Sequence, residues 1–67
     1  MNIYEMSMPA TPHNISIVRK IAKEQGYSLK KVRNEDIFDL FDNQSETYRF
    51  RNTPLGDIYD SLVSNDD

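Results

Sequence analysis

The residues of this 67-residue chain that could do chemistry are carboxylates, serines and one histidine, because the sequence contains no cysteine. Asp36, Asp39 and Asp42 lie close together, but a calcium or phosphoryl-transfer site needs more oxygen ligands and a glycine turn. His13 stands alone beside Pro12, where a capping or surface role is more common than catalysis. No serine has a histidine or lysine partner at the spacing of a nucleophile motif. The sequence predicts no catalytic residue, metal site or cofactor, and an enzyme is not expected.

Charge is sorted along the chain, although the net charge is only −3. The first half is basic, with Arg19, Lys20, Lys23, Lys30, Lys31 and Arg33. The acidic residues gather later, at Glu35, Asp36, Asp39, Asp42, Glu46, Asp57, Asp60, Asp66 and Asp67. An acidic total argues against a general nucleic-acid-binding protein, but a local basic face could still bind phosphate.

Two amphipathic helices are predicted, and each follows a Thr-Pro pair, Thr11-Pro12 and Thr53-Pro54. Threonine is a good N-cap and proline suits the first helical position. Apolar residues then recur at helical spacing, at Ile15, Val18, Ile21 and Ala22 in the first case and at Leu55, Ile58, Tyr59 and Leu62 in the second. The first helix is expected over residues 14–25, with Asn14 as a competing cap and Gly26 as the residue that ends it.

Between the helices the apolar period changes to two, which is typical of strands. The clearest alternation lies in residues 47–51, where Tyr48 and Phe50 share one face. Residues 37–42 place Phe38 and Leu40 on one face and Ile37, Asp39 and Phe41 on the other. The first of the three strands, over residues 27–32, is less regular, because its lysines interrupt the apolar face.

The turn between the second and third strands determines which side chains meet. A three-residue turn, Asn43-Gln44-Ser45, would pair Leu40 with Tyr48 and Phe38 with Phe50 on the core side. The same register places Asp39 opposite Arg49 on the outer side. A two-residue turn would shift the pairing by one residue and bring Asp39 beside Phe50. The sequence therefore favours the three-residue turn.

These elements predict an α+β fold with a helix, a three-stranded antiparallel meander and a C-terminal helix. Residues 1–10 are interpreted as a flexible or sheet-covering N-terminal arm, residues 11–63 as one α-β-β-β-α domain and residues 64–67 as an acidic disordered tail. The expected core is Ile15, Val18, Ala22, Leu29, Phe38, Leu40, Tyr48, Phe50, Leu55, Ile58 and Leu62. A domain of this size buries only about 60% of its unfolded surface, so association is an expected source of further stability.

The outer side of the sheet is the candidate binding surface. Its predicted partner-binding residues are Ile37, Asp39, Phe41, Arg49 and Arg51. An exposed apolar pair surrounded by opposite charges is typical of a protein interface. The alternatives are that the N-terminal arm covers this side or that the two helices lie on opposite faces of the sheet.

Residues 18–35 also permit a helical interpretation. The segment IAKEQGYSLKKV, residues 21–32, resembles the helix-turn-helix of bacterial repressors, with an alanine, a glycine four residues later and apolar residues in the second helix. The resemblance implies a recognition helix over residues 28–35. Its DNA-facing side chains would be Lys30, Lys31 and Arg33. Gln25 and Glu35 stand where the pattern has apolar residues, and we favour a helix end followed by a strand.

Residues 26–62 carry a second resemblance, in GYSLKKVR, an LFD run and PLGDIYDSL. Together these segments resemble short uncharacterised bacterial and phage proteins with a helix, an aromatic meander and a closing helix. The resemblance implies a fold and an origin in a phage or mobile element, and it implies no activity.

The sequence thus predicts a small acidic protein-interaction module that regulates or inhibits a larger protein partner by docking on it. The alternatives are a helix-turn-helix DNA-binding regulator, the only interpretation in which nucleic acid is a partner, and a homo-oligomeric structural subunit. No apolar run approaches the roughly 20 residues of a membrane span. The first residues do not resemble a secretory signal. A cytoplasmic protein without a membrane partner is expected.

Overall fold

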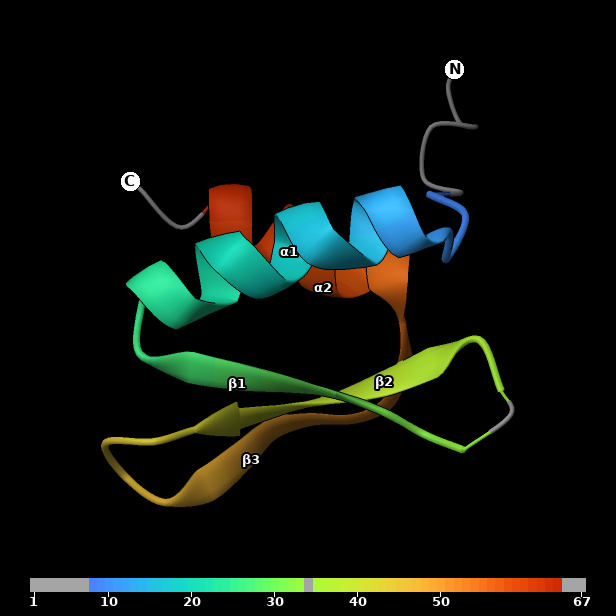
Figure 1. The fold of residues 1–67 in the computed structure, drawn as a ribbon. Helices are drawn as coiled ribbons and strands as arrows, with labels where there is room; N and C mark the ends of the chain where they lie inside the picture. The colour runs from blue at the N-terminus through green and yellow to red at the C-terminus, as the bar shows by residue number, and fades with distance from the viewer. Residues whose placement is uncertain (1–7, 34, 65–67) are drawn as a thin grey trace.

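Two helices lie on one face of a three-stranded sheet (Figure 1). The computed structural model describes residues 8–33 and 35–64. In chain order the elements are α1 (Pro12–Glu24), β1 (Tyr27–Lys31), β2 (Ile37–Asp42), β3 (Thr47–Pro54) and α2 (Leu55–Val63). The strands form an antiparallel meander with β2 in the centre, so the predicted α+β fold is confirmed. Helix α1 packs on β1 and α2, and α2 also packs on β3.

Helix α1 begins two residues earlier than predicted, because the first Thr-Pro pair caps it. The Thr11 hydroxyl accepts a hydrogen bond from the Asn14 N–H at 3.1 Å, and Pro12 occupies the first helical position. At the other end Gly26 has a φ of +89° and its N–H donates to the Lys23 carbonyl. Glycine adopts this left-handed conformation without steric cost, so the predicted helix end is confirmed.

The second Thr-Pro pair does not cap α2, and that prediction was wrong. Residues Thr53 and Pro54 belong to β3, which continues directly into the helix. The Thr53 hydroxyl donates to the Arg51 carbonyl at 3.0 Å, and the capping residue of α2 is Pro54, which makes no side-chain hydrogen bond to the helix. The strand takes Thr53 because this residue pairs with Phe38.

The core lies between the helices and the inner face of the sheet. Its buried residues are Val18, Ala22, Leu29, Phe38, Leu40, Leu55, Ile58 and Leu62, all of which were predicted. The predicted core residues Ile15 and Phe50 are half-buried against this cluster. The predicted burial of Tyr48 was wrong, since this side chain is 42% exposed.

A longer turn explains the displacement of Tyr48. The turn has four residues, Asn43 to Glu46, rather than three, and Phe41 pairs with Tyr48. The Asp42 carboxylate accepts hydrogen bonds from the N–H groups of Gln44 and Ser45. Glu46 is the last residue of the turn and has a φ of +60°. The predicted pairs Leu40–Tyr48, Phe38–Phe50 and Asp39–Arg49 are therefore not formed.

The register of β2 and β3 shifts twice along the ladder. Irregularities lie between Leu40 and Phe41 and between Phe38 and Leu40, so Leu40 pairs with Phe50. An extra residue in one strand changes which side chains share a face. The first shift lets Tyr48 lie on the outer face while Phe50 still packs against the core.

None of the described residues of the proposed recognition helix, 28–33 and 35, is helical. Residues 28–31, where it would begin, belong to β1 and pair with β2 through Ser28–Phe41, Leu29–Leu40, Lys30–Asp39 and Lys31–Phe38. Leu29 is buried on the inner face of this strand. Residue 27 follows the glycine that ends α1, and the chain turns there into the sheet, as the favoured interpretation predicted.

Candidate protein-interaction surface

The side of the sheet that faces away from the helices carries a compact group of aromatic and charged side chains. We define this outer face by Lys30, Ile37, Asp39, Phe41, Tyr48 and Arg51. Cross-strand partners in an antiparallel sheet project to the same side. The pairs Lys30–Asp39 and Phe41–Tyr48 therefore bring side chains from all three strands together.

The centre of the outer face is a row of four side chains. The rings of Phe41 and Tyr48 meet edge to face, with 5.1 Å between centroids and 72° between planes. The Lys30 Nζ lies 5.3 Å from the Phe41 centroid, and the Arg51 Cζ lies 4.3 Å from the Tyr48 centroid. A cation over a ring face is attracted by the ring's electrons. The aromatic pair thus has a cation on each side, Lys30 beside Phe41 and Arg51 beside Tyr48.

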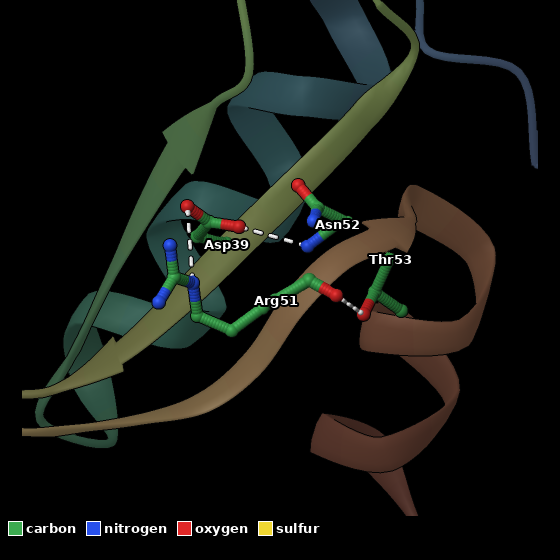
Figure 2. A network of polar contacts seen from close by, with 4 residues as sticks. All are labelled: Asp39, Arg51, Asn52 and Thr53. Atoms are coloured by element: carbon green, nitrogen blue, oxygen red, sulfur yellow. Dashed lines mark hydrogen bonds and ion pairs between the residues drawn. The ribbon is translucent and has the colours of Figure 1, made fainter.

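Asp39 holds one end of this row in place (Figure 2). Its Oδ2 lies 3.9 Å from the Arg51 Nε, and its Oδ1 accepts a hydrogen bond from the Asn52 N–H at 2.8 Å. Asn52 has a φ of +52°, a conformation that asparagine adopts more readily than most residues. The carboxylate therefore positions Arg51 and also stabilises the second irregularity of β3.

Sequence reasoning placed four of the outer-face residues correctly and misplaced a fifth. Ile37, Asp39, Phe41 and Arg51 share this face, as expected. Arg49 does not, because its Cζ lies 5.8 Å from the ring centroids of both Tyr27 and Phe50. Both rings pack against the core cluster on the helix side. The expected position of Arg49 assumed a three-residue turn. With four turn residues Tyr48 lies on the outer face, so the next residue, Arg49, falls on the inner side.

Two residues of the outer face were missed. Tyr48 was assigned to the core, and Lys30 was considered only as a DNA contact. The signal for Tyr48 is Asp42, an aspartate at the start of the turn, since its side chain can bond the N–H groups that follow. Lys30 is opposite Asp39, two residues along β2 from Phe41, and this position can be recognised only once β1 is paired with β2.

No described element covers the outer face within residues 8–33 and 35–64 (Figure 1). Of the predicted N-terminal arm, Met8 and Ala10 pack against the core cluster rather than on the outer face. Residues 1–7 of the arm and residues 65–67 of the predicted tail lie outside the described residues. Both helices lie on the inner face, which excludes the alternative with one helix on each side of the sheet.

The three residues of the DNA-binding alternative do not share a surface. Lys30 lies on the outer face, whereas the next residue, Lys31, projects to the inner side and lies 5.9 Å from the Phe38 ring. The Lys31 Nζ also donates to the carbonyls of Arg33 and Glu35, at 3.4 and 2.7 Å. Lys31 thus stabilises the loop between β1 and β2, and Arg33 lies in that loop with a φ of +40°.

Neither a metal cluster nor a membrane-crossing helix is found in the part of the chain that the structure describes. Its histidine and carboxylates nowhere form a group of three that could hold an ion. Its helices are too short and too polar to cross a bilayer. His13 is exposed in the first turn of α1.

Comparisons of the chain with protein-family models, curated proteins and solved structures give no match.

Proposed function

We propose that this protein is an interaction module, encoded by a phage or another mobile element, that regulates or inhibits a larger protein by docking its outer face on it. The observation that carries the proposal is the Phe41–Tyr48 pair with Lys30 and Arg51 at its two edges. Aromatic residues and arginine supply most of the binding energy in protein interfaces.

The arrangement suits binding because its side chains are already held in place. Arg51 contacts both Tyr48 and Asp39, so it loses less conformational freedom on binding than a free arginine would. Tyr48 is 42% exposed and therefore has apolar surface left to bury. The complementary surface would have an apolar centre with carboxylates at two of its edges, opposite Lys30 and Arg51.

The first step of the test is to capture the partner at the proposed surface. A photoreactive phenylalanine analogue in place of Tyr48 would cross-link whatever covers the outer face in the natural host. A cross-linked larger protein, identified by mass spectrometry and then purified, supports the proposal. A cross-link between two copies of this chain would instead support the homo-oligomeric alternative, which sedimentation of the unmodified protein would check.

The second step measures the affinity of the purified partner for three variants. Phe41→Ala and Arg51→Glu should each weaken binding about tenfold or more, since the first removes a ring of the central pair and the second reverses the charge beside it. Arg49→Glu makes the same charge change on the other side of the sheet and is the matched control. Equal affinities for all three variants, with unchanged circular dichroism, would exclude the outer face as the docking surface.

A further inference from the structure

The second feature that could bind a partner is the free edge of β1. Strand β2 is central, so among residues 8–33 and 35–64 β1 has a neighbouring strand on one side only. The Val32 N–H donates to the Ile37 carbonyl and the Asn43 N–H to the Gly26 carbonyl, so even-numbered residues of this segment bond to β2. In an antiparallel ladder the intervening residues direct their backbone groups away from the neighbour. Tyr27, Leu29 and Lys31 therefore present their N–H and C=O groups to the open edge.

A groove of about 420 Å³ runs along this edge. It is bordered by Arg19 and Lys23 of α1, by residues 27–30 of β1 and by Asn43. Three of these side chains are cations, Arg19, Lys23 and Lys30, and none is a carboxylate. The groove therefore combines a row of backbone groups that do not bond to β2 with a positive wall.

Arg19 shows that the edge accepts hydrogen bonds from outside the sheet. Its Nη2 donates to the Leu29 carbonyl at 3.3 Å, and both residues line the groove. The guanidinium occupies the position that the N–H of an added strand would take. In the free protein this contact protects the edge from pairing with other chains.

We propose that β1 binds an extended acidic segment of a partner protein as a fourth strand. The incoming backbone would bond to the N–H and C=O groups of Leu29, while its carboxylates would meet Arg19, Lys23 and Lys30. A backbone N–H of the partner would take the place of Arg19 at the Leu29 carbonyl. The Arg19 guanidinium would then be free to bind a carboxylate of the same segment. This edge goes beyond the proposed function, and it adjoins the outer face only at Lys30.

Charge and hydrogen-bond chemistry decide among the possible occupants. A second copy pairing through its own β1 would bring two positive grooves together, which like-charge repulsion disfavours. The phosphates of a nucleic acid could pair with the cations, but they are hydrogen-bond acceptors and cannot donate to the Leu29 carbonyl. The other sheet edge, β3, contains two register irregularities and a residue with positive φ, so it is a poor template for pairing.

The test uses a short, fluorescently labelled peptide of alternating glutamate and valine with blocked ends. Binding is followed by fluorescence polarisation, and hydrogen exchange of the Leu29 N–H is followed by NMR. The proposal expects measurable binding and slower exchange at Leu29. N-methylation of the peptide at alternate residues removes its N–H donors and should weaken binding about tenfold.

Variants of the groove provide the control for charge. Arg19→Glu and Lys23→Glu should each weaken peptide binding about tenfold, whereas Lys20→Glu changes the same charge on the same helix outside the groove and should have a smaller effect. Arg51→Glu should leave peptide binding nearly unchanged, because Arg51 lies on β3, the opposite edge strand, and this separates the proposal from the function of the outer face.

Three results would overturn the proposal. The first is no binding of the glutamate–valine peptide at millimolar concentration. The second is equal binding of the N-methylated peptide, which would mean that no strand is added. The third is tighter binding of oligothymidine than of the peptide without protection of the Leu29 N–H, which would make the groove a site for nucleic-acid phosphate.

Discussion

Replacement of Asp39 tests whether one carboxylate stabilises both the irregular part of β3 and the arginine of the outer face. The side chain is 17% exposed, whereas that of Arg51 is 63% exposed. An ion pair of this kind contributes about 0–1 kcal/mol. A hydrogen bond to a charged group contributes about 1.5–3 kcal/mol, with exposed bonds at the lower end. We therefore expect Asp39→Ala to lower the free energy of unfolding by about 2 kcal/mol.

Asp39→Asn separates the two contributions because it keeps an oxygen that can accept from the Asn52 N–H. It loses the charge, and with it the ion pair and the charge-assisted part of the hydrogen bond. The expected loss is about 1 kcal/mol or less, roughly half of the alanine effect. Asp36→Ala removes an exposed carboxylate from the loop before β2 and should change stability by less than about 0.5 kcal/mol.

Urea unfolding followed by circular dichroism measures these differences. A domain of 67 residues is expected to have a total stability of roughly 3–10 kcal/mol, so the alanine effect is large enough to resolve. It corresponds to a decrease in Tm of roughly 8–16 °C. Equal losses for Asp39→Ala and Asp39→Asn would show that the charge of Asp39, rather than its oxygen as a neutral acceptor, accounts for the stabilisation. No loss for Asp39→Ala would refute the role assigned to the carboxylate.

Three further predictions concern the framework of the fold and use the same unfolding measurement. Thr11→Ala removes the hydroxyl that caps α1 and should cost about 1 kcal/mol, whereas Thr11→Ser should cost little. Gly26→Ala should cost about 1 kcal/mol through backbone strain at φ +89° alone, because an added Cβ would meet no atom within 4 Å. Phe38→Ala empties the centre of the core and should lower the free energy of unfolding by about 3–5 kcal/mol. Much of the chain would then be unfolded at ambient temperature. A cooperative transition of near-normal stability would contradict the central position of this ring.

The helices and the core could be predicted from the sequence because both depend on short-range patterns. The apolar spacing in α1 and α2 identified five of the eight buried side chains, and the alternation in the strands identified Leu29, Phe38 and Leu40. Gly26 marked the end of α1. The Thr-Pro pairs show the limit of such patterns. The same dipeptide caps α1 through Thr11 but continues a strand at Thr53, because Thr53 has Phe38 as a cross-strand partner.

The composition of the outer face could be predicted only in part, because it depends on strand register. Glu46 adopts a positive φ although it is neither glycine nor asparagine, so its identity gave no signal of a fourth turn residue. That single residue moves Tyr48 to the outer face. The same residue moves Arg49 to the inner side, where it lies near Tyr27 and Phe50. The first register shift of β3 then returns Phe50 to that side.

The meander order of the strands has a consequence for how the chain folds. Each strand pairs with its neighbour in the sequence, so both hairpins can form without bringing distant segments together. Among the described elements, the contact of α1 with α2 joins the two ends of the domain. Chains with mainly local contacts fold faster than chains that must first close long loops. We therefore expect folding in the millisecond range or faster, with docking of α2 onto α1 as the last event.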